Sequence, residues 1–509
     1  MSEHALPPSE PVPVPPARES DDATVSEFGY RQELRRSLRL FSLYAIAFSF
    51  ISITTGIYLN FGVGVNAFGP LSIWFFGILG VAQLLVAVVM AELGSRIPLA
   101  GYAYQWGSRL IDPGYGWIVG FTALLWMVTG LAGICSLAAA PLIATLFGWN
   151  AGSQSLLLVI ALVIIVAATA VNIISIRLAA RFNNAAVGTE IIGTALLGVI
   201  LFIVWLARGQ HLHGLSFLFT TGGVHGSAIW KIGIPYSILM GAYTLAGFEV
   251  AADLSEEGVN VRTSVPRAII WSLVSATILG MIALIGFAIA IPHLHAIQTS
   301  ATPLPDIIRY WLGGGWTKVF LAFVIFSILG LTVALPACQA RVIYSMSRDN
   351  ILPFSRWMRE VNPQTRTPIV GLVVGAGLTI AFVLWGYFGA HSFLVLVVAS
   401  AAFPFVIYFF TLIAYWFRHS RLPAPPNAFS LGRWRTPVVI AAFVWVVFVL
   451  VCLMAPSAFH QADWIIVGVP AFAFIWYLLV LRRRLKMGLA GPESAEGGTP
   501  DTKVSAEQK

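Results

Sequence analysis

Charged side chains are scarce in this sequence. Only 10% of its 509 residues are Asp, Glu, Lys or Arg, while 58% are hydrophobic. A typical soluble domain carries about 25% charged residues. A chain this poor in charge cannot cover a folded surface with polar side chains, so most of its surface must face lipid. The scarcity excludes an ordinary water-soluble protein.

Cysteine is scarce as well, and Cys135, Cys338 and Cys452 all fall inside long apolar runs. Thiols in such runs are typically small packing residues, so the sequence predicts no disulfide framework. Histidines gather in polar stretches, as His211 and His213 do. Solvated histidines are far more common there than metal ligands. We therefore expect no metal site, no cofactor and no catalytic residue.

Apolar runs of about 20 residues recur along the chain, and each can cross a hydrocarbon core of roughly 30 Å as a helix. Runs such as 156–168 are apolar on every face, whereas strands of a membrane barrel alternate apolar and polar residues. The sequence therefore predicts an all-α integral membrane protein with about twelve transmembrane helices. The expected spans lie near residues 40–65, 71–93, 115–147, 156–176, 184–206, 232–256, 268–291, 316–345, 369–388, 391–417, 436–455 and 463–481.

The 30 Lys and Arg residues produce a net charge of +8, and their positions follow the predicted topology. With a cytoplasmic N-terminus, every basic residue falls on the cytoplasmic side except Arg208, Lys231, Arg309 and Lys318. Cytoplasmic loops of membrane proteins carry such an excess. Topology therefore explains the basic charge, and no nucleic acid partner is expected. We predict a multi-pass protein of the plasma (inner) membrane, with both termini cytoplasmic and the lipid bilayer as its surroundings.

Two polar tails flank the apolar region. Residues 1–30 are rich in proline and acidic residues and lack an early apolar core, so we expect a disordered tail and no cleavable signal peptide. Residues 483–509 are expected to form a second disordered tail. One transmembrane domain, residues 31–482, is predicted between them.

The first ten spans form two stretches of similar length, about 40–206 and 232–417, and the last two, about 436–481, follow as an addition. Many transporters contain two inverted five-helix repeats, each with a first helix that is broken at mid-membrane. Polar and small residues interrupt the corresponding spans here, at 52–56 and 243–249. Singly, such residues more often serve helix packing, but their matched positions favour a binding site.

A helix broken within the membrane leaves backbone groups that only a cavity or a ligand can satisfy. The N–H groups that start a half-helix suit a carboxylate, and the carbonyls that end one suit an ammonium group or a cation. Two such breaks could together hold a zwitterion.

Two acidic residues fall inside predicted spans, where an ionisable group suggests function. Glu249 lies in the second interruption and could bind a substrate amine or a proton; the alternative is a carboxylate bonded to the broken backbone. Glu190 lies about one and a half turns inside the span 184–206 and is a candidate proton carrier. Its alternative is an interfacial acid paired with a basic loop residue.

Four stretches resemble the amino acid/choline/GABA permease branch of the amino acid–polyamine–organocation (APC) superfamily. They are ITTGIY at 53–58, AELGSRIPLAGYAYQW at 91–106, the segment 247–268 with its GFE and VPRA elements, and RVIYSMSRD with Pro353 at 341–353. All four occur in order at the expected spans, and the resemblance covers about residues 28–482.

This resemblance implies a leucine-transporter-type fold, with a 5+5 inverted repeat, two C-terminal helices and alternating access, so that residues 31–482 form a permease domain. By position it assigns substrate binding to Ile53, Thr54, Thr55, Gly56, Thr244, Leu245, Ala246, Gly247, Phe248 and Glu249. Related cationic amino acid carriers have a proton-responsive lysine after an Arg-x-Asn-Asn motif. The same motif begins here at Arg181 and places Glu190 at that position, so Glu190 and Glu249 are the proton-coupling candidates.

We therefore expect a secondary active transporter, a permease for amino acids or amino-acid-like amines such as GABA, with the proton as coupling ion. Choline or polyamine transport, amino acid exchange and sodium coupling remain alternatives. A membrane enzyme is a remote alternative because no catalytic cluster stands out. A channel is a second remote alternative, because channels generally show a repeated filter motif and this sequence has none.

Overall fold

The computed structural model describes residues 24–209, 211–300, 302–388 and 393–492, without the side chains of 393–396. Within these residues the chain is built of helices and loops, with one isolated bridge between Leu38 and Gly258. The α-helices are α2 (Leu40–Ile51), α3 (Ile53–Phe68), α4 (Ile73–Arg96), α5 (Tyr102–Leu110), α6 (Pro113–Gly133), α7 (Ala140–Leu146), α8 (Gln154–Ile174), α9 (Ile176–Arg208), α10 (Ile234–Thr244), α11 (Val261–Ile289), α12 (Leu294–Gln298), α13 (Pro303–Arg348), α14 (Ser355–Met358), α15 (Ile369–Phe388), α16 (Phe393–Arg418), α17 (Arg435–Met454), α18 (His460–Trp476) and α19 (Arg482–Lys486). The shorter helical segments used below are η1 (Gly69–Ser72), η2 (Ile134–Ala139), η5 (Phe248–Ala252) and η6 (Ser255–Glu257).

Ten segments of the described chain are long and apolar enough to cross a membrane. The first, Leu40–Arg96, has 57 residues and joins α2, α3 and α4 through η1. Its two ends lie beside the same loop, because Leu38 pairs with Gly258 and Ser95 donates a hydrogen bond to the carbonyl of Arg262. This segment therefore crosses the membrane and returns.

The expected span at 232–256 is present but is not a continuous helix. It consists of α10, a non-helical stretch at 245–247, and the 3₁₀ segments η5 and η6. Ten segments, one of them crossing twice, together with this interrupted one supply the predicted twelve crossings of the described chain.

Two other spans are longer than the sequence predicted. Helix α9 begins at Ile176 because Ser175 accepts the amide of Leu178 and caps it. Helix α13 begins at Pro303 and bends at Gly313, where φ is 85°. Span boundaries depend on such caps and bends as much as on hydropathy.

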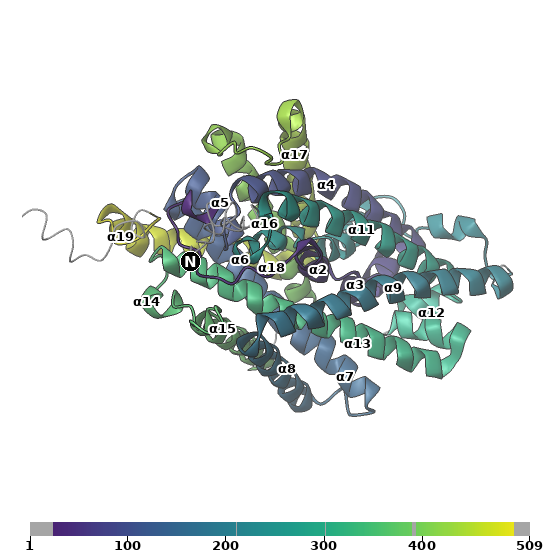
Figure 1. Cartoon of the computed structure of the whole chain (residues 1–509). Helices are drawn as coiled ribbons and strands as arrows, with labels where there is room; N and C mark the ends of the chain where they lie inside the picture. The colour runs from purple at the N-terminus through teal and green to yellow at the C-terminus, as the bar shows by residue number, and fades with distance from the viewer. Residues whose placement is uncertain (1–23, 210, 301, 389–392, 493–509) are drawn as a thin grey trace, which may run out of the picture.

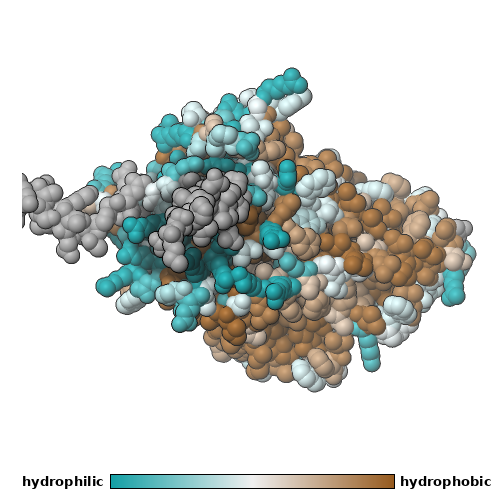
Figure 2. Space-filling view, viewed as in Figure 1, coloured by the Kyte–Doolittle hydropathy of each residue, from teal (hydrophilic) through white to brown (hydrophobic). Residues whose placement is uncertain are grey.

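The helices pack around α2, α3 and α10, with α4 and α11 on one side and α9 and α13 on another (Figure 1). The outer faces are apolar. Ile192, Leu196, Val199, Ile203 and Leu206 form an exposed stripe along α9 at helical spacing. Figure 2 shows that such hydrophobic surface covers much of the bundle, as expected of a lipid-facing wall.

Most basic loops meet at one end of the bundle, which we call the basic end. Arg96 donates to the carbonyl of Pro423, and Arg421 donates to the carbonyl of Leu110. Figure 2 shows hydrophilic side chains gathered at this end, on the left. The basic end comprises residues 24–39, 96–112, 258–262, 349–368, 418–435 and 482–492.

Both expected tails extend too far into the folded region. Of residues 1–30, those from 24 onward are described, and Val25, Phe28 and Tyr30 among them are buried. Of residues 483–509, those up to 492 are described, and the amide of Gly491 donates to the carbonyl of Asp349. Aromatic and apolar side chains at the tail edges find partners on the bundle. The remaining tail residues lie outside the described residues.

Candidate functional site

The first interruption is a single residue, Ser52, between α2 and α3. Its backbone is left-handed (φ 38°, ψ 75°), which ends α2, and its amide donates to the carbonyl of Phe48. Helix α3 then starts at Ile53, so residues 53–56 are the first turn of a half-helix. The N–H groups of Ile53, Thr54 and Thr55 have no partner within their own helix and carry partial positive charge, which suits them to an anion, whereas Gly56 donates to the carbonyl of Ser52.

The second interruption follows Thr244, at residues 245–247. Gly247 has φ 91°, a conformation that side chains rarely permit, and it leads into η5. The hydroxyl of Tyr408 on α16 accepts the Gly247 amide at 3.1 Å and donates to Glu249 Oε2 at 2.8 Å. Tyr408 thus binds the broken backbone and the adjacent carboxylate together.

The two interruptions touch. A Cβ at Gly56 would overlap the side chain of Thr244, so α3 begins against the end of α10. The N–H groups that start one half-helix therefore lie close to the carbonyls that end the other. This pairing of opposite partial charges matches the two ends of a zwitterion.

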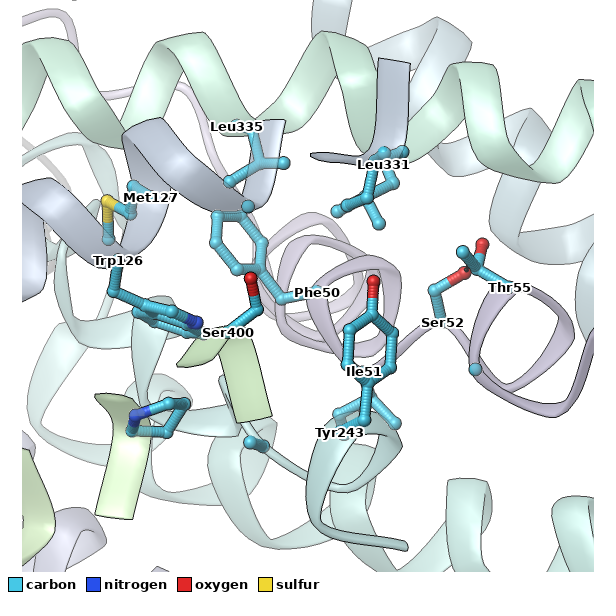
Figure 3. A pocket seen from close by; sticks show the side chains of 15 residues that line it. Phe50, Ile51, Ser52, Thr55, Trp126, Met127, Tyr243, Leu331, Leu335 and Ser400 are labelled. Atoms are coloured by element: carbon cyan, nitrogen blue, oxygen red, sulfur yellow. Dashed lines mark hydrogen bonds between the residues drawn. The ribbon is translucent and has the colours of Figure 1, made fainter. Parts of the chain in front are cut away.

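A central cavity of about 50 Å³ lies against both interruptions (Figure 3). In Figure 3, Phe50 and Trp126 lie on one side of it, Ser52 and Thr55 on the other, and the hydroxyl of Tyr243 points into it. The lining residues come from α2, α3, α6, η2, α10, α13 and α16 together with the two breaks: Phe50, Ile51, Ser52, Thr55, Gly56, Trp126, Met127, Gly130, Ile134, Tyr243, Ala246, Leu331, Leu335, Ser400 and Pro404.

The lining contains aromatic, aliphatic and hydroxyl side chains, and none of these residues is charged. The rings of Phe50 and Trp126 lie 6.1 Å apart, and Leu331 and Leu335 face them from α13. Any charge on a solute in this cavity must therefore be met by the half-helix ends and by ring faces. That arrangement suits a compact solute with little net charge.

Glu190 lies behind the first interruption rather than in the cavity. It is 1% exposed, and its Oε1 accepts the Thr54 amide at 2.8 Å and the Ser52 hydroxyl at 3.3 Å. Ser327 on α13 faces the same carboxylate. Because α9 begins at Ile176, Glu190 lies about four turns from the start of its helix, further than the one and a half turns expected from the start of the predicted span. Among the described residues it forms no ion pair, so pairing with a basic loop residue does not hold.

Buried ion pairs close the basic end beneath the cavity. Arg341 contacts Glu257 at 2.7 Å with both side chains at most 1% exposed, and Arg348 contacts Glu256 at 2.9 Å. They join the end of α13 to the η6 segment, so two segments of the second repeat are tied together at this end.

The N-terminal segment is part of the same closure. The hydroxyls of Tyr30 and Tyr104 donate to Asp349 at 2.8 Å and 2.6 Å, and the Arg348 guanidinium lies 3.6 Å from the centre of the Tyr30 ring. Asp349 follows the last residue of α13. Burial raises the pKa of this carboxyl, although Arg348 and the two tyrosines act in the opposite direction.

Of the ten residues expected to bind substrate, three line the cavity: Thr55, Gly56 and Ala246. Ile53 and Thr54 sit in the first turn of α3, and Glu249 faces Tyr408 instead of the cavity. The others, Thr244, Leu245, Gly247 and Phe248, shape the second interruption behind the lining.

Sequence reasoning left most of the lining unassigned. Lining residues recur four apart, at 126 and 130 in α6, 331 and 335 in α13, and 400 and 404 in α16. This spacing marks one helix face, but every packed face has the same period. Only the tertiary arrangement distinguishes the face that meets the cavity.

The sequence pattern of the amino acid permease family matches residues 38–481. The amino-acid permease BAT1 of Arabidopsis thaliana is 24% identical over 472 residues, which are 87% of this chain and 90% of the relative. The GABA-specific permease of Saccharomyces cerevisiae is 25% identical over 460 residues, covering 87% of this chain and 79% of that permease. The solved structure of MhsT in complex with L-phenylalanine superposes with a TM-score of 0.59 at 15% identity, covering 82% of this chain and 99% of MhsT. That likeness shows a leucine-transporter-type fold.

Proposed function

The chain belongs to the amino acid permease family, within the APC superfamily, and from that premise we propose a secondary active transporter of zwitterionic amino acids or GABA-like solutes. It binds its solute in the central cavity and exposes it to one side of the membrane at a time. No catalytic role is part of this proposal.

The assignment of the substrate class rests on one observation. The two helix interruptions meet at Gly56 and Thr244, beside a cavity whose lining has no charged side chain. The substrate carboxylate binds at the first turn of α3, and its ammonium group binds at the end of α10 and against the Trp126 and Tyr243 rings. The leucines of α13 then contact the apolar part of the solute.

The same observation weighs against polyamines, which carry several positive charges and no carboxylate. Such a solute needs acidic side chains in its cavity, and Glu249 is engaged with Tyr408 outside the lining. Choline lacks a carboxylate but suits the aromatic wall, so it is the second candidate.

We propose that Glu190 couples transport to protons. A carboxyl group this deep in a membrane protein, next to the first interruption and without a basic partner among the described residues, can change charge as the site changes shape. We further propose a plasma (inner) membrane location with the basic end cytoplasmic, as the distribution of Lys and Arg favours.

Uptake into proteoliposomes tests the proposal. A labelled panel of L-phenylalanine, L-alanine, GABA, choline and putrescine is measured with and without an inward proton gradient. We expect uptake of a zwitterion, stimulated by the gradient. Uptake of putrescine alone, or gradient-independent uptake, contradicts the substrate class or the coupling respectively.

A cavity variant with a matched control locates the site. Gly130 lines the cavity and Gly377 lies on an exposed face of α15, and both have open space around them. Gly130→Leu fills the cavity and should abolish uptake, whereas Gly377→Leu should leave it unchanged. Equal uptake by both variants places the site elsewhere.

A further inference from the structure

A second, smaller cavity of about 10 Å³, room for about one water molecule, lies between α2, α8, α9 and α13, on the basic-end side of Glu190. Two buried asparagines are part of its lining, Asn172 on α8 and Asn183 on α9, and we call it the amide pocket. The central cavity and the amide pocket share no lining residue.

Asn183 is 1% exposed, and neither its Oδ1 nor its Nδ2 has a hydrogen-bond partner among the described residues. Asn172 is fully buried and donates to the carbonyls of Ala168 and Val333, while its Oδ1 is without a partner in the same part of the chain. Buried amides are normally satisfied, and water is the small ligand that both donates to and accepts from them.

Helix α13 leads from Glu190 to this pocket through small residues. Ser327 faces the Glu190 carboxylate, and a side chain at Gly330, three residues on, would overlap Ala186 and approach Asn183 Oδ1. Three residues further along α13, the carbonyl of Val333 accepts a hydrogen bond from Asn172. Asn183 and Glu190 are seven residues apart on α9, which places them on one helix face about 10 Å apart.

The pocket is closed toward the basic end by Leu38 and Leu254, which are at most 2% exposed. Leu38 precedes α2 and Leu254 follows η5, so both belong to the half-spans next to the interruptions. An opening of the basic end that moved these half-spans would connect the pocket to water. Around Glu190, Tyr44 on α2 is a titratable neighbour, and its hydroxyl bonds Ser275. The other polar neighbours described here are the Thr54 amide and hydroxyl groups.

We propose that the amide pocket binds water and carries protons between Glu190 and the basic end. When the basic end opens, water admitted along α13 between the pocket and Glu190 takes the carboxyl proton and leaves the carboxylate. The pocket water relays that proton, releasing one of its own to the aqueous side. Asn183 holds the water and is a positioning residue. This inference rests on the proposed role of Glu190 in coupling.

Infrared spectroscopy of the full-length protein in lipid tests the route without any substrate. The carboxylic C=O band of Glu190 is identified by its loss in Glu190→Gln, and its shift after transfer to D₂O is followed in time. Asn183→Leu removes both amide atoms and should slow the shift by about tenfold. Asn183→Ser, whose hydroxyl still holds water, should restore most of the rate.

Two further variants separate the route from a general structural effect. Ala334→Leu fills the pocket from α13 without changing an asparagine and should also slow the exchange. Thr189→Val, on the exposed face of α9, should exchange like the wild type. Wild-type exchange in both pocket-blocking variants, or the absence of a Glu190 carboxyl band, overturns the inference. Gradient-independent uptake with slowed exchange in Asn183→Leu overturns the coupling proposal and leaves the water route standing.

Discussion

The two helix interruptions each have a buried glutamate beside them, yet the two carboxylates are held differently. Glu190 reaches the first interruption from another helix, and its partners are one amide and hydroxyl groups. Glu249 lies within the second interruption and is bound by Tyr408 from α16. The first is backed by a pocket with unpaired amides, and the second by a tyrosine that also holds the broken backbone. The difference favours a proton carrier at Glu190 and an anchor at Glu249.

The largest expected effect comes from replacing each of the two glutamates with glutamine, one at a time. Glu190→Gln keeps the shape and hydrogen bonding of the side chain but cannot change charge, so we expect proton stimulation of uptake to disappear while substrate binding remains. Glu249→Gln should keep the proton stimulation of whatever uptake is left. Proteoliposome uptake with and without a gradient measures both. Loss of stimulation in Glu249→Gln alone reverses the assignment.

The contact between the interruptions is tested at Gly56. Gly56→Ala introduces a methyl group where Thr244 lies, so we expect transport to be lost by displacement of the half-helices. Adding Thr244→Gly removes the overlap and should restore part of the uptake. Uptake assays with thermal melting as a folding control measure this pair. Normal uptake by Gly56→Ala would show that the two interruptions need not touch.

Removing the anchor should affect stability more than coupling. Tyr408→Phe deletes the hydroxyl between Gly247 and Glu249 in a buried position, which costs about 1–3 kcal/mol of stability. We expect a lower melting temperature in detergent with the proton stimulation retained. Tyr415→Phe, which loses a hydroxyl bound to Glu92 at the basic end, is the matched control. A loss of proton stimulation in Tyr408→Phe contradicts the anchor role.

The smallest expected effect lies at Asp349. Burial raises its pKa in the folded protein above the unfolded value, so its protonated form stabilises the closed basic end. That stability is fully present below the unfolded pKa and is lost as pH rises through the folded pKa. Asp349→Asn should flatten the melting temperature as a function of pH in this acidic range. An unchanged slope in the variant argues against Asp349 as the titrating group.

Much of the fold could be predicted because hydropathy and charge act locally. The apolar runs determined the spans, and the matched polar clusters at 52–56 and 243–249 indicated where two of them break. The break positions hold in the structure, at Ser52 and at Gly247. The cavity wall could not be predicted, since residues such as Leu331 and Ser400 look like any packed helix face.

The sequence by itself therefore determined that this chain is a membrane protein, how often it crosses the membrane, and which acidic residues lie inside the spans. These properties follow from the cost of placing charge and unpaired backbone in lipid, which each segment meets on its own. Only the tertiary structure decided which side chains meet the substrate, that Glu249 bonds to Tyr408, and that Asn183 faces a pocket near Glu190. Such contacts join residues far apart in the chain, and the packing of whole helices sets them.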